Sequence, residues 1–410
     1  MKQFAKHRHA LEAKRPGAGI VTATPIFSRI DDVVRTMAEE KPIHCLYPHI
    51  LQRQARFFLE TFPGKTLYAV KANPDKDVLK FLYAYGIRHF EVVSRAEIDL
   101  VLATVGPAKL YFMHPVKARS AIRHAYGRGL RDFAFDSRDE LRKILDETGR
   151  ADDLGLLLRV AVANDEAALN LSAKFGASPE EAIELLQEAR PAANRLGICF
   201  HVGSQCTAPG AFRRALQRVG TIIKEGGVAL DILDVGGGFP SPYPGYNAPP
   251  LGRFLASIQK AIADFNLGAF ELWCEPGRAM VSEAGSVLAK VELRKDDKLY
   301  LNDGTYGALF DAGQLGWRYP TRVVRPAGVT DKTLKPFKFF GPTCDCLDSM
   351  PGPFLLPADV REGDWIEIQN LGGYGLSMRT NFNGFGTDLS AIVEGPRGQV
   401  KKFKIQEVKA

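Results

Sequence analysis

The sequence predicts an α/β protein that consists of a (β/α)8 barrel and a smaller antiparallel β domain. The first observation is length, because 410 residues exceed the usual size of a single domain. The second is a repeat between residues 64 and 279, in which short apolar strands alternate with amphipathic helical stretches. The third is a change after residue 280 to short alternating strands interrupted by Gly and Pro.

Eight strands are expected in the repeat, which favours a closed barrel over an open doubly wound sheet. They are Leu67–Val70, Phe90–Val93, Leu110–Met113, Phe133–Phe135, Gly155–Val160, Ile198–Val202, Ile232–Val235 and Leu272–Glu275. The helical stretches between them include Asp75–Tyr85, Arg95–Ala103, Ala118–Tyr126, Arg138–Glu147, Pro179–Glu188, Ala211–Lys224 and Arg253–Phe265. Because the carboxyl ends of barrel strands open on one face, residues that follow different strands are expected to meet there.

The second domain is expected to contain the strands Val287–Leu293, Trp365–Gln369 and Ala391–Val393. Gly19–Ile26 is a candidate for a further strand of the same domain. The sequence therefore predicts three parts: a basic leader with a joining strand at 1–41, a barrel at 42–279 and a C-terminal β domain at 280–410.

Charge and cysteine content argue against several classes of protein. The net charge of +7 comes from 54 basic and 47 acidic residues without a dense Lys/Arg block, so nucleic-acid binding is not expected. No apolar run approaches the roughly 20 residues that span a bilayer, so no membrane helix is expected. Six cysteines in a chain of this length indicate free thiols and a cytoplasmic location. The Cys344-x-Cys346 pair has no second pair at zinc spacing, so no metal site is predicted.

Lys71 is the first candidate site residue. It ends a short apolar strand, and a lysine at the mouth of a strand is a candidate Schiff-base nucleophile, the alternative being a surface ion pair. Two later loops favour the first reading: Gly236–Gly238 offers bare backbone to a phosphate, and Glu275-Pro-Gly-Arg278 offers a carboxylate and a guanidinium. An amine, a phosphate site and an acid are the attachments that pyridoxal phosphate (PLP) requires.

The positions of these loops strengthen the PLP hypothesis. The glycines and Arg278 follow the seventh and eighth strands, where barrels most often bind phosphate, although three glycines alone also fit a tight turn. Glu275 would keep the pyridine nitrogen protonated and so favour carbanion chemistry such as decarboxylation; otherwise it caps the Pro-Gly turn. His201 would stack on the cofactor ring with Ser204 near the phosphate, unless it is a core histidine bonded to a backbone carbonyl.

Six motifs between residues 42 and 395 resemble one family. They are Tyr68-Ala-Val-Lys-Ala-Asn, His201-Val-Gly-Ser, Asp234-Val-Gly-Gly-Gly-Phe-Pro, Glu275-Pro-Gly-Arg, Gly341-Pro-Thr-Cys-Asp345, and Gly373-Tyr374 with Phe382-Asn-Gly-Phe385. The chain resembles fold-type III PLP-dependent decarboxylases that act on basic amino acids. This resemblance implies an alanine-racemase-like barrel, a C-terminal β domain and a head-to-tail homodimer whose active sites are shared across the interface.

The resemblance also implies roles for individual residues. Cys344 would donate a proton to the decarboxylated carbon and Asp345 would bind the distal amine, both from the partner chain. The cofactor-binding residues would be Lys71, His201, Ser204, Gly237, Gly238, Glu275, Gly277, Arg278 and Tyr374. Glu91, Arg159 and Tyr306 would lie near the barrel mouth.

The substrate expectation rests on the Cys344-Asp345 pair. It resembles ornithine or lysine decarboxylases, whereas diaminopimelate decarboxylases usually carry Cys-Glu. The chain lacks the Tyr-Asp pair that holds the distal amine in eukaryotic-type ornithine decarboxylases; Asp311 is the candidate substitute. We expect a carboxy-lyase that converts L-ornithine to putrescine, with lysine decarboxylation to cadaverine as the main alternative.

Three other functions are less favoured. Diaminopimelate decarboxylation is disfavoured by Asp345. A non-catalytic homologue that binds regulatory partners need not keep Lys71, Glu275 and Cys344, all of which are present. A PLP carrier would more naturally be a barrel without residues 280–410.

Overall fold

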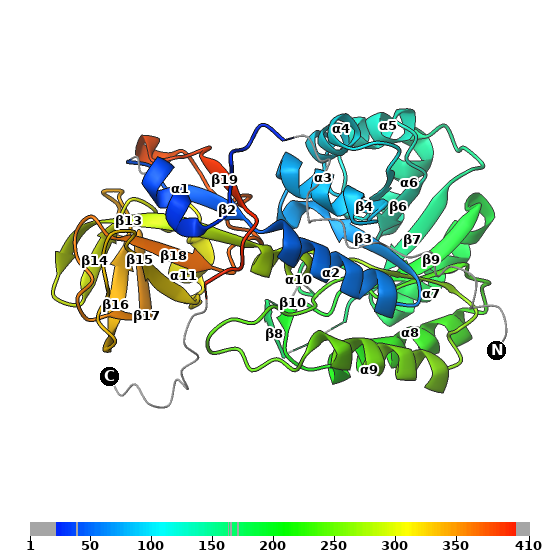
Figure 1. Cartoon of the computed structure of the whole chain (residues 1–410). Helices are drawn as coiled ribbons and strands as arrows, with labels where there is room; N and C mark the ends of the chain where they lie inside the picture. The colour runs from blue at the N-terminus through cyan, green and yellow to red at the C-terminus, as the bar shows by residue number, and fades with distance from the viewer. Residues whose placement is uncertain (1–21, 38–39, 163, 165, 170–171, 399–410) are drawn as a thin grey trace.

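The chain folds into a barrel and a β domain that lie side by side (Figure 1). The computed structural model describes residues 22–37, 40–162, 164, 166–169 and 172–398. Within them no helix is long and apolar enough to cross a membrane. The same residues contain no cluster of three or more His, Cys, Asp or Glu side chains placed to hold a metal ion.

Eight parallel strands close the barrel, as the sequence predicts. In spatial order they are β11 (Ile232–Asp234), β12 (Glu271–Cys274), β3 (Lys65–Ala69), β4 (His89–Val92), β5 (Lys109–Phe112), β6 (Asp132–Phe135), β7 (Gly155–Arg159) and β9 (Arg195–Cys199). Alternate side chains such as Leu67, Leu157 and Trp273 fill the interior. Their neighbours pack outward beneath the helices.

One barrel strand differs from its predicted position. The sixth strand was expected at Ile198–Val202, but β9 ends at Cys199, where it pairs with both Arg159 and Asp234. The next residues leave the sheet because the chain turns at Gly203, whose φ of 92° is in the left-handed region. This turn places His201 at the barrel mouth rather than inside a strand.

Helices cover the outside of the barrel (Figure 1). They are α2 (Pro48–Thr61), α3 (Lys76–Ala84), α4 (Arg95–Thr104), α5 (Arg119–Gly127), α6 (Arg138–Glu147), α7 (Pro179–Ala189), α8 (Gly210–Gly226) and α9 (Leu251–Asp264). Side-chain caps fix several starts: Asp75, Ser94, Ser137 and Ser178 each accept backbone N–H groups of the helix that follows.

The second domain is a separate β domain, as expected; its nine-stranded sheet is mixed, because three parallel pairs occur beside the antiparallel pairs that the sequence predicts. The path β1-β19-β2-β13-β14-β16-β17 carries β18 and β15 as a branch from β13. The strands are β1 (Ile26–Phe27), β2 (Ile43–Leu46), β13 (Gly285–Lys295), β14 (Lys298–Leu301), β15 (Thr321–Val324), β16 (Leu334–Phe340), β17 (Ser349–Pro357), β18 (Trp365–Gln369) and β19 (Ser390–Val393). Three pairs are parallel: β1 with β19, β19 with β2, and β14 with β16.

The N-terminal part of the chain also belongs to this sheet. β2 was expected to lie in the barrel part at 42–279, but it pairs with β13 and β19. A boundary at residue 42 therefore cuts off one strand of the β domain, because this pairing joins segments that are distant in sequence. Residues 19–21 of the candidate strand Gly19–Ile26 lie outside the described residues, and the structure has β1 at Ile26–Phe27, so that only Ile26 of the candidate is in a strand among the residues described.

Candidate active site

Lys71 lies in a short 3₁₀ turn, Val70–Ala72, directly after β3. Its Nζ donates hydrogen bonds of 3.0 and 2.8 Å to the two carboxylate oxygens of Glu91, at the end of the neighbouring strand β4. The Lys71 side chain is 39% exposed, whereas that of Glu91 is 1% exposed. Desolvation lowers the pKa of Lys71, but Glu91 and then Glu275 raise it, and the net pKa lies above its ordinary value. In the free protein Lys71 is therefore a charged amine held at the barrel mouth.

Two carboxyl groups meet at the ends of β11 and β12. Asp234 is completely buried and Glu275 nearly so. Burial raises the pKa of Glu275 well above its ordinary value, and Asp234 and then Glu91 raise it further. Burial also raises the pKa of Asp234, whose Oδ1 accepts the Gly236 N–H at 2.8 Å while Oδ2 has no partner among the described residues. Such a pair retains a proton at neutral pH, because two adjacent buried carboxylates repel each other.

The glycine loop follows Asp234 and lies against His201. Gly236 and Gly238 have φ angles of 65° and 101°. A Cβ at Gly237 would lie 3.0 Å from His201 Nε2 and 2.7 Å from the Glu275 carbonyl oxygen, so the backbone approaches both residues closely. The His201 ring accepts the Gly203 N–H at Nδ1, 3.0 Å away. Desolvation, then Arg159 and Lys71, lower its pKa well below the usual value, so the imidazole is neutral.

Arg278, at the start of the one-turn helix α10 (Arg278–Val281), is enclosed by aromatic rings and one acid. Its guanidinium carbon lies 4.5 Å from the ring centres of Trp317 and Tyr374. Nη1 donates to Asp311 Oδ2 at 3.1 Å and to the Tyr243 hydroxyl at 3.3 Å. Nε is buried and has no partner among the described residues. One edge of the guanidinium therefore still has a free donor for an anion.

Asp311 occupies a different place from the one the sequence suggested. It was expected near the distal amine of a substrate, but its side chain is buried against Arg278. In the part of the chain that the structure describes, no hydrogen bond or ion pair joins it to Tyr306 or Asp345. Sequence reasoning also missed Tyr243 and Trp317, because neither lies in a recognisable motif.

A loop of the β domain packs against the Lys71 turn within the same chain. The Tyr374 N–H donates to the Ala72 carbonyl oxygen at 2.7 Å, and Asn73 Nδ2 donates to the Gly372 carbonyl oxygen at 2.8 Å. Gly277 approaches the same segment, since a Cβ there would lie 3.1 Å from that of Ala72. These contacts place Lys71, Tyr374 and Arg278 around one site. Ser204 begins the short strand β10 (Ser204–Cys206), just beyond His201.

Glu97 is a residue that sequence reasoning missed. Burial and then the nearby Glu91 raise its pKa to about 7, and its Oε2 accepts the Val93 N–H at 2.8 Å. The signal was present, because Ser94-x-x-Glu97 is the pattern of a capping box at the start of α4. Its proximity to Glu91 and Lys71 appears only in the fold.

Cys344, Asp345 and Tyr306 form a second group on the β domain. The Tyr306 hydroxyl donates to Asp345 Oδ2 at 2.6 Å, and the Cys344 thiol lies 3.6 Å from Asn383 Oδ1. The Tyr306 ring packs on Phe382 with 4.7 Å between ring centres. The Leu347 N–H and the Tyr306 hydroxyl lower the pKa of Asp345. Cys344 is exposed and Asp345 is partly buried, and no hydrogen bond or ion pair links either to Lys71 or Glu275 among the described residues.

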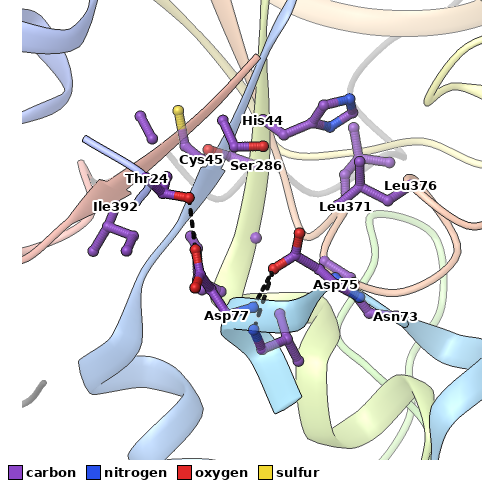
Figure 2. Close-up of a pocket in the computed structure, with 16 residues that line it drawn as sticks. Thr24, His44, Cys45, Asn73, Asp75, Asp77, Ser286, Leu371, Leu376 and Ile392 are labelled. Carbon is purple, nitrogen blue, oxygen red and sulfur yellow. Dashed lines mark hydrogen bonds between the residues drawn. The ribbon is translucent and has the colours of Figure 1, made fainter. Parts of the chain in front are cut away.

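A small pocket lies at the junction of the two domains, beside the segment that follows Lys71 (Figure 2). Asp75 accepts the N–H groups of Asp77 and Val78, and Thr24 donates to Asp77 Oδ2 at 2.6 Å. The cavity measures about 30 Å³, which is room for roughly one water molecule. It is too small for a cofactor and belongs to the domain junction.

Residues 49–282 match the family described as pyridoxal-dependent decarboxylase, pyridoxal binding domain. The chain belongs to this family. It is 33% identical over 367 residues to a lysine/ornithine decarboxylase of Selenomonas ruminantium, which covers 86% of this chain and 90% of the relative. It is 35% identical over 348 residues to an ornithine decarboxylase of the nematode Panagrellus redivivus, covering 78% of this chain and 77% of that protein.

The fold agrees with the family. The arginine decarboxylase of Paramecium bursaria Chlorella virus, solved with agmatine, superimposes with a TM-score of 0.79 at 26% identity, covering 89% of this chain and 99% of that one. The resemblance stated from the motifs is thus confirmed, as are the barrel and the predicted cofactor, PLP. The site also fits PLP: Arg278 has a free buried donor, the glycine loop presents backbone without side chains next to His201, and the buried carboxyl groups of Asp234 and Glu275 have raised pKa values at the strand ends.

Proposed function

We propose that this decarboxylase acts on L-ornithine and releases putrescine. The observation that supports it is Asp345, a partly buried carboxylate whose pKa is lowered and which has no Lys or Arg partner among the described residues. An acid without a counter-charge suits the distal ammonium of a diamino acid. A substrate with a second carboxylate, such as diaminopimelate, would require a cation there instead. Lysine is the closest competitor, since it differs from ornithine by one methylene.

The barrel residues would hold the cofactor. Lys71 would carry PLP through its Nζ, while the glycine loop (Gly237 and Gly238), Ser204, Gly277, Arg278 and Tyr374 would surround the phosphate. His201 would lie against the ring. Glu275, whose pKa is raised by burial and then by Asp234, would bind the protonated ring nitrogen. Bound in this way, PLP supplies the electron sink for decarboxylation.

The β-domain residues would act on the substrate. The Cys344 thiol would give its proton to the carbon that has lost carbon dioxide, and Asp345 would bind the distal ammonium. The Tyr306 hydroxyl holds the Asp345 carboxylate in one orientation by donating to Oδ2. Tyr306 therefore fits a positioning role more closely than a direct substrate contact.

We assign Asp311 to cofactor binding rather than to substrate binding. Its contact with Nη1 fixes the guanidinium of Arg278, so that Nε stays directed away from the acid. An arginine side chain that is already fixed loses less conformational entropy when it binds a phosphate. Asp311 is in this view a positioning residue for Arg278.

The active protein would be a homodimer with shared sites. Lys71 lies on the barrel and Cys344 on the β domain. Among the described residues of one chain, no hydrogen bond joins the two side chains. Apolar side chains near Cys344 are exposed, with Leu347 at 58% and Phe385 at 47%. A second copy that covers this surface would bring its own Lys71 to Cys344 and bury apolar area.

The test is carbon dioxide release from ornithine, lysine, arginine and diaminopimelate, measured side by side with saturating PLP. We expect ornithine to give the highest kcat/KM. One methylene supports a preference over lysine of about 10- to 200-fold, and the other two substrates should fall lower still. A higher kcat/KM for lysine would reassign the product to cadaverine. Absence of carbon dioxide from all four, with PLP bound, would indicate a non-catalytic relative.

A further inference from the structure

Two exposed thiols flank Asp345 in the loop between β16 and β17. All six cysteines are free, and only Cys344 and Cys346 are exposed. The other four are buried, and burial raises the pKa of each of their thiols. They are Cys45, Cys199, Cys206 and Cys274. Because oxidants react with exposed thiolates, the reactive sulfur of this chain is concentrated at Cys344 and Cys346.

The ends of this loop are fixed, whereas its centre has few contacts. Asp348 anchors the loop by accepting the N–H groups of Thr305 and Thr343 at 2.7 and 3.0 Å and by donating its backbone N–H to Asp345. At the centre, Cys344 has only its 3.6 Å contact with Asn383 among the hydrogen bonds of its side chain. The Cys344 side chain can therefore move while the Asp348 contacts stay in place.

The chain already bends where the two thiols would have to meet. The Leu347 N–H donates to Asp345 Oδ1 at 2.9 Å, which folds the backbone into a turn just after Asp345. Disulfides join α-carbons about 4.4–6.8 Å apart, a separation that a bent three-residue segment satisfies. Closure would draw the Cys344 sulfur away from Asn383 and toward Cys346.

We propose that Cys344 and Cys346 form a reversible redox modification site that takes hydroperoxides. The Cys344 thiolate attacks one peroxide oxygen, the O–O bond breaks, and the other oxygen leaves as water or an alcohol after protonation. The sulfenic acid formed is attacked by the Cys346 thiolate, so that an S–S bond forms, the S–O bond breaks, and hydroxide leaves and is protonated to water. Two thiols are oxidised by two electrons, and one peroxide is reduced.

The effect on activity rests on the proposed function, in which Cys344 supplies a proton to the product. A sulfur tied into a disulfide has no proton to give, and the closed ring would displace Asp345 from the Tyr306 hydroxyl. In the shared site the thiol must lie within reach of a substrate, so a smaller peroxide reaches it by the same path. A dithiol reductant would restore both thiols.

The test treats the PLP-loaded enzyme with a small excess of hydrogen peroxide and follows mass and activity together. We expect a mass loss of about 2 Da per chain, located in the tryptic peptide spanning residues 339–361, and loss of two free thiols. Turnover should fall in parallel and recover with dithiothreitol. Intact mass before and after reduction distinguishes a disulfide from other oxidation products.

Cys346→Ser is the matched variant, because it removes the second thiol and leaves Cys344 in place. It should turn over like wild type before oxidation. After peroxide it should gain about 32 or 48 Da at Cys344 instead, because no second thiol traps the sulfenic acid before it is oxidised to the sulfinic or sulfonic acid, and its loss of activity should resist dithiothreitol. Equal recovery of both proteins by dithiothreitol, or no 2 Da loss in wild type, would overturn the proposal. A disulfide that forms without loss of turnover would support the site and instead remove Cys344 from the proposed reaction.

Discussion

The two halves of the candidate site differ in how completely one chain builds them. On the barrel, Lys71, Glu91, Asp234 and Glu275 are in mutual electrostatic contact, and their environment shifts the pKa of several of them. On the β domain, Tyr306, Cys344 and Asp345 are held by a few hydrogen bonds at an exposed surface. Buried charges are costly without partners, whereas exposed groups are not. The barrel half is therefore preorganised within one chain, whereas the β-domain half is held by fewer contacts.

The largest expected effect is on the barrel half. Lys71→Ala removes the only group of this site that can bond PLP covalently, so we expect turnover to fall on the order of 10⁴-fold, or about 5.5 kcal/mol of barrier. The measurement is decarboxylation together with borohydride reduction, which should no longer fix PLP to the chain. PLP that is still fixed in the variant would identify another lysine as the anchor.

The contrast between the two halves depends on a shared site, in which one chain supplies the barrel half and the other chain supplies the β-domain half. Cys344→Ala alone should be nearly inactive, but mixing it with Lys71→Ala under subunit exchange should restore activity. Random pairing makes half of the dimers mixed, each with one intact site, so recovery should approach about a quarter of wild-type activity. A tag on one variant confirms exchange. If exchange occurs without recovery, the shared-site dimer is wrong.

A variant of the buried carboxyl pair, Asp234 and Glu275, tests the electrostatic role of the barrel half. Glu275→Gln keeps the phosphate contacts but removes the charged partner of the ring nitrogen, so PLP should stay bound while kcat falls more than about tenfold, or 1.4 kcal/mol. Glu271→Gln is the matched control on the same strand, since Glu271 pairs with Lys65 and Arg195 at the opposite end of β12. A similar kcat loss in both variants would make the role of Glu275 structural.

A smaller effect is expected at the arginine anchor. Asp311→Asn should weaken PLP binding by about tenfold, because Arg278 loses the carboxylate that fixes it. Cofactor titration by absorbance or fluorescence measures this, and kcat at saturating PLP should change little. Asp359→Asn breaks a comparable pair with Arg325 outside the site and should leave PLP affinity unchanged. Unchanged affinity in Asp311→Asn, with ornithine KM raised instead, would return Asp311 to the substrate.

The smallest effect concerns pH. The folded-state pKa of Glu97 is about 7, above the ordinary value of 4.5, so the unfolded chain binds fewer protons between these pH values. Glu97 therefore makes stability fall as pH rises from about 4.5 to 7. Glu97→Gln should flatten that slope in thermal unfolding, whereas Asp345→Asn on the exposed half should not change it. An unchanged slope in Glu97→Gln would contradict the raised pKa.

Much of the barrel half was predictable because its signals are local. The eight strands follow from alternating apolar segments and helices, and all but the sixth lie within one or two residues of their expected positions. Lys71, Gly236–Gly238 and Glu275 could be proposed as site residues because each follows a strand, and strand ends in a barrel meet by topology. The motifs also identified Cys344 and Asp345 as candidates, without showing where they lie relative to Lys71.

The sequence by itself determined the barrel, the cofactor and the family, since those depend on periodicity and on short motifs. The tertiary structure decided that β2 joins the β-domain sheet, that this sheet is mixed, and that Asp311 pairs with Arg278. It also decided that burial and the nearby Asp234 raise the pKa of Glu275, and that Cys344 and Cys346 alone among the cysteines are exposed. These features depend on contacts between residues that are far apart in sequence. The burial and the charge environment of each residue are set by those tertiary contacts and not by its own segment.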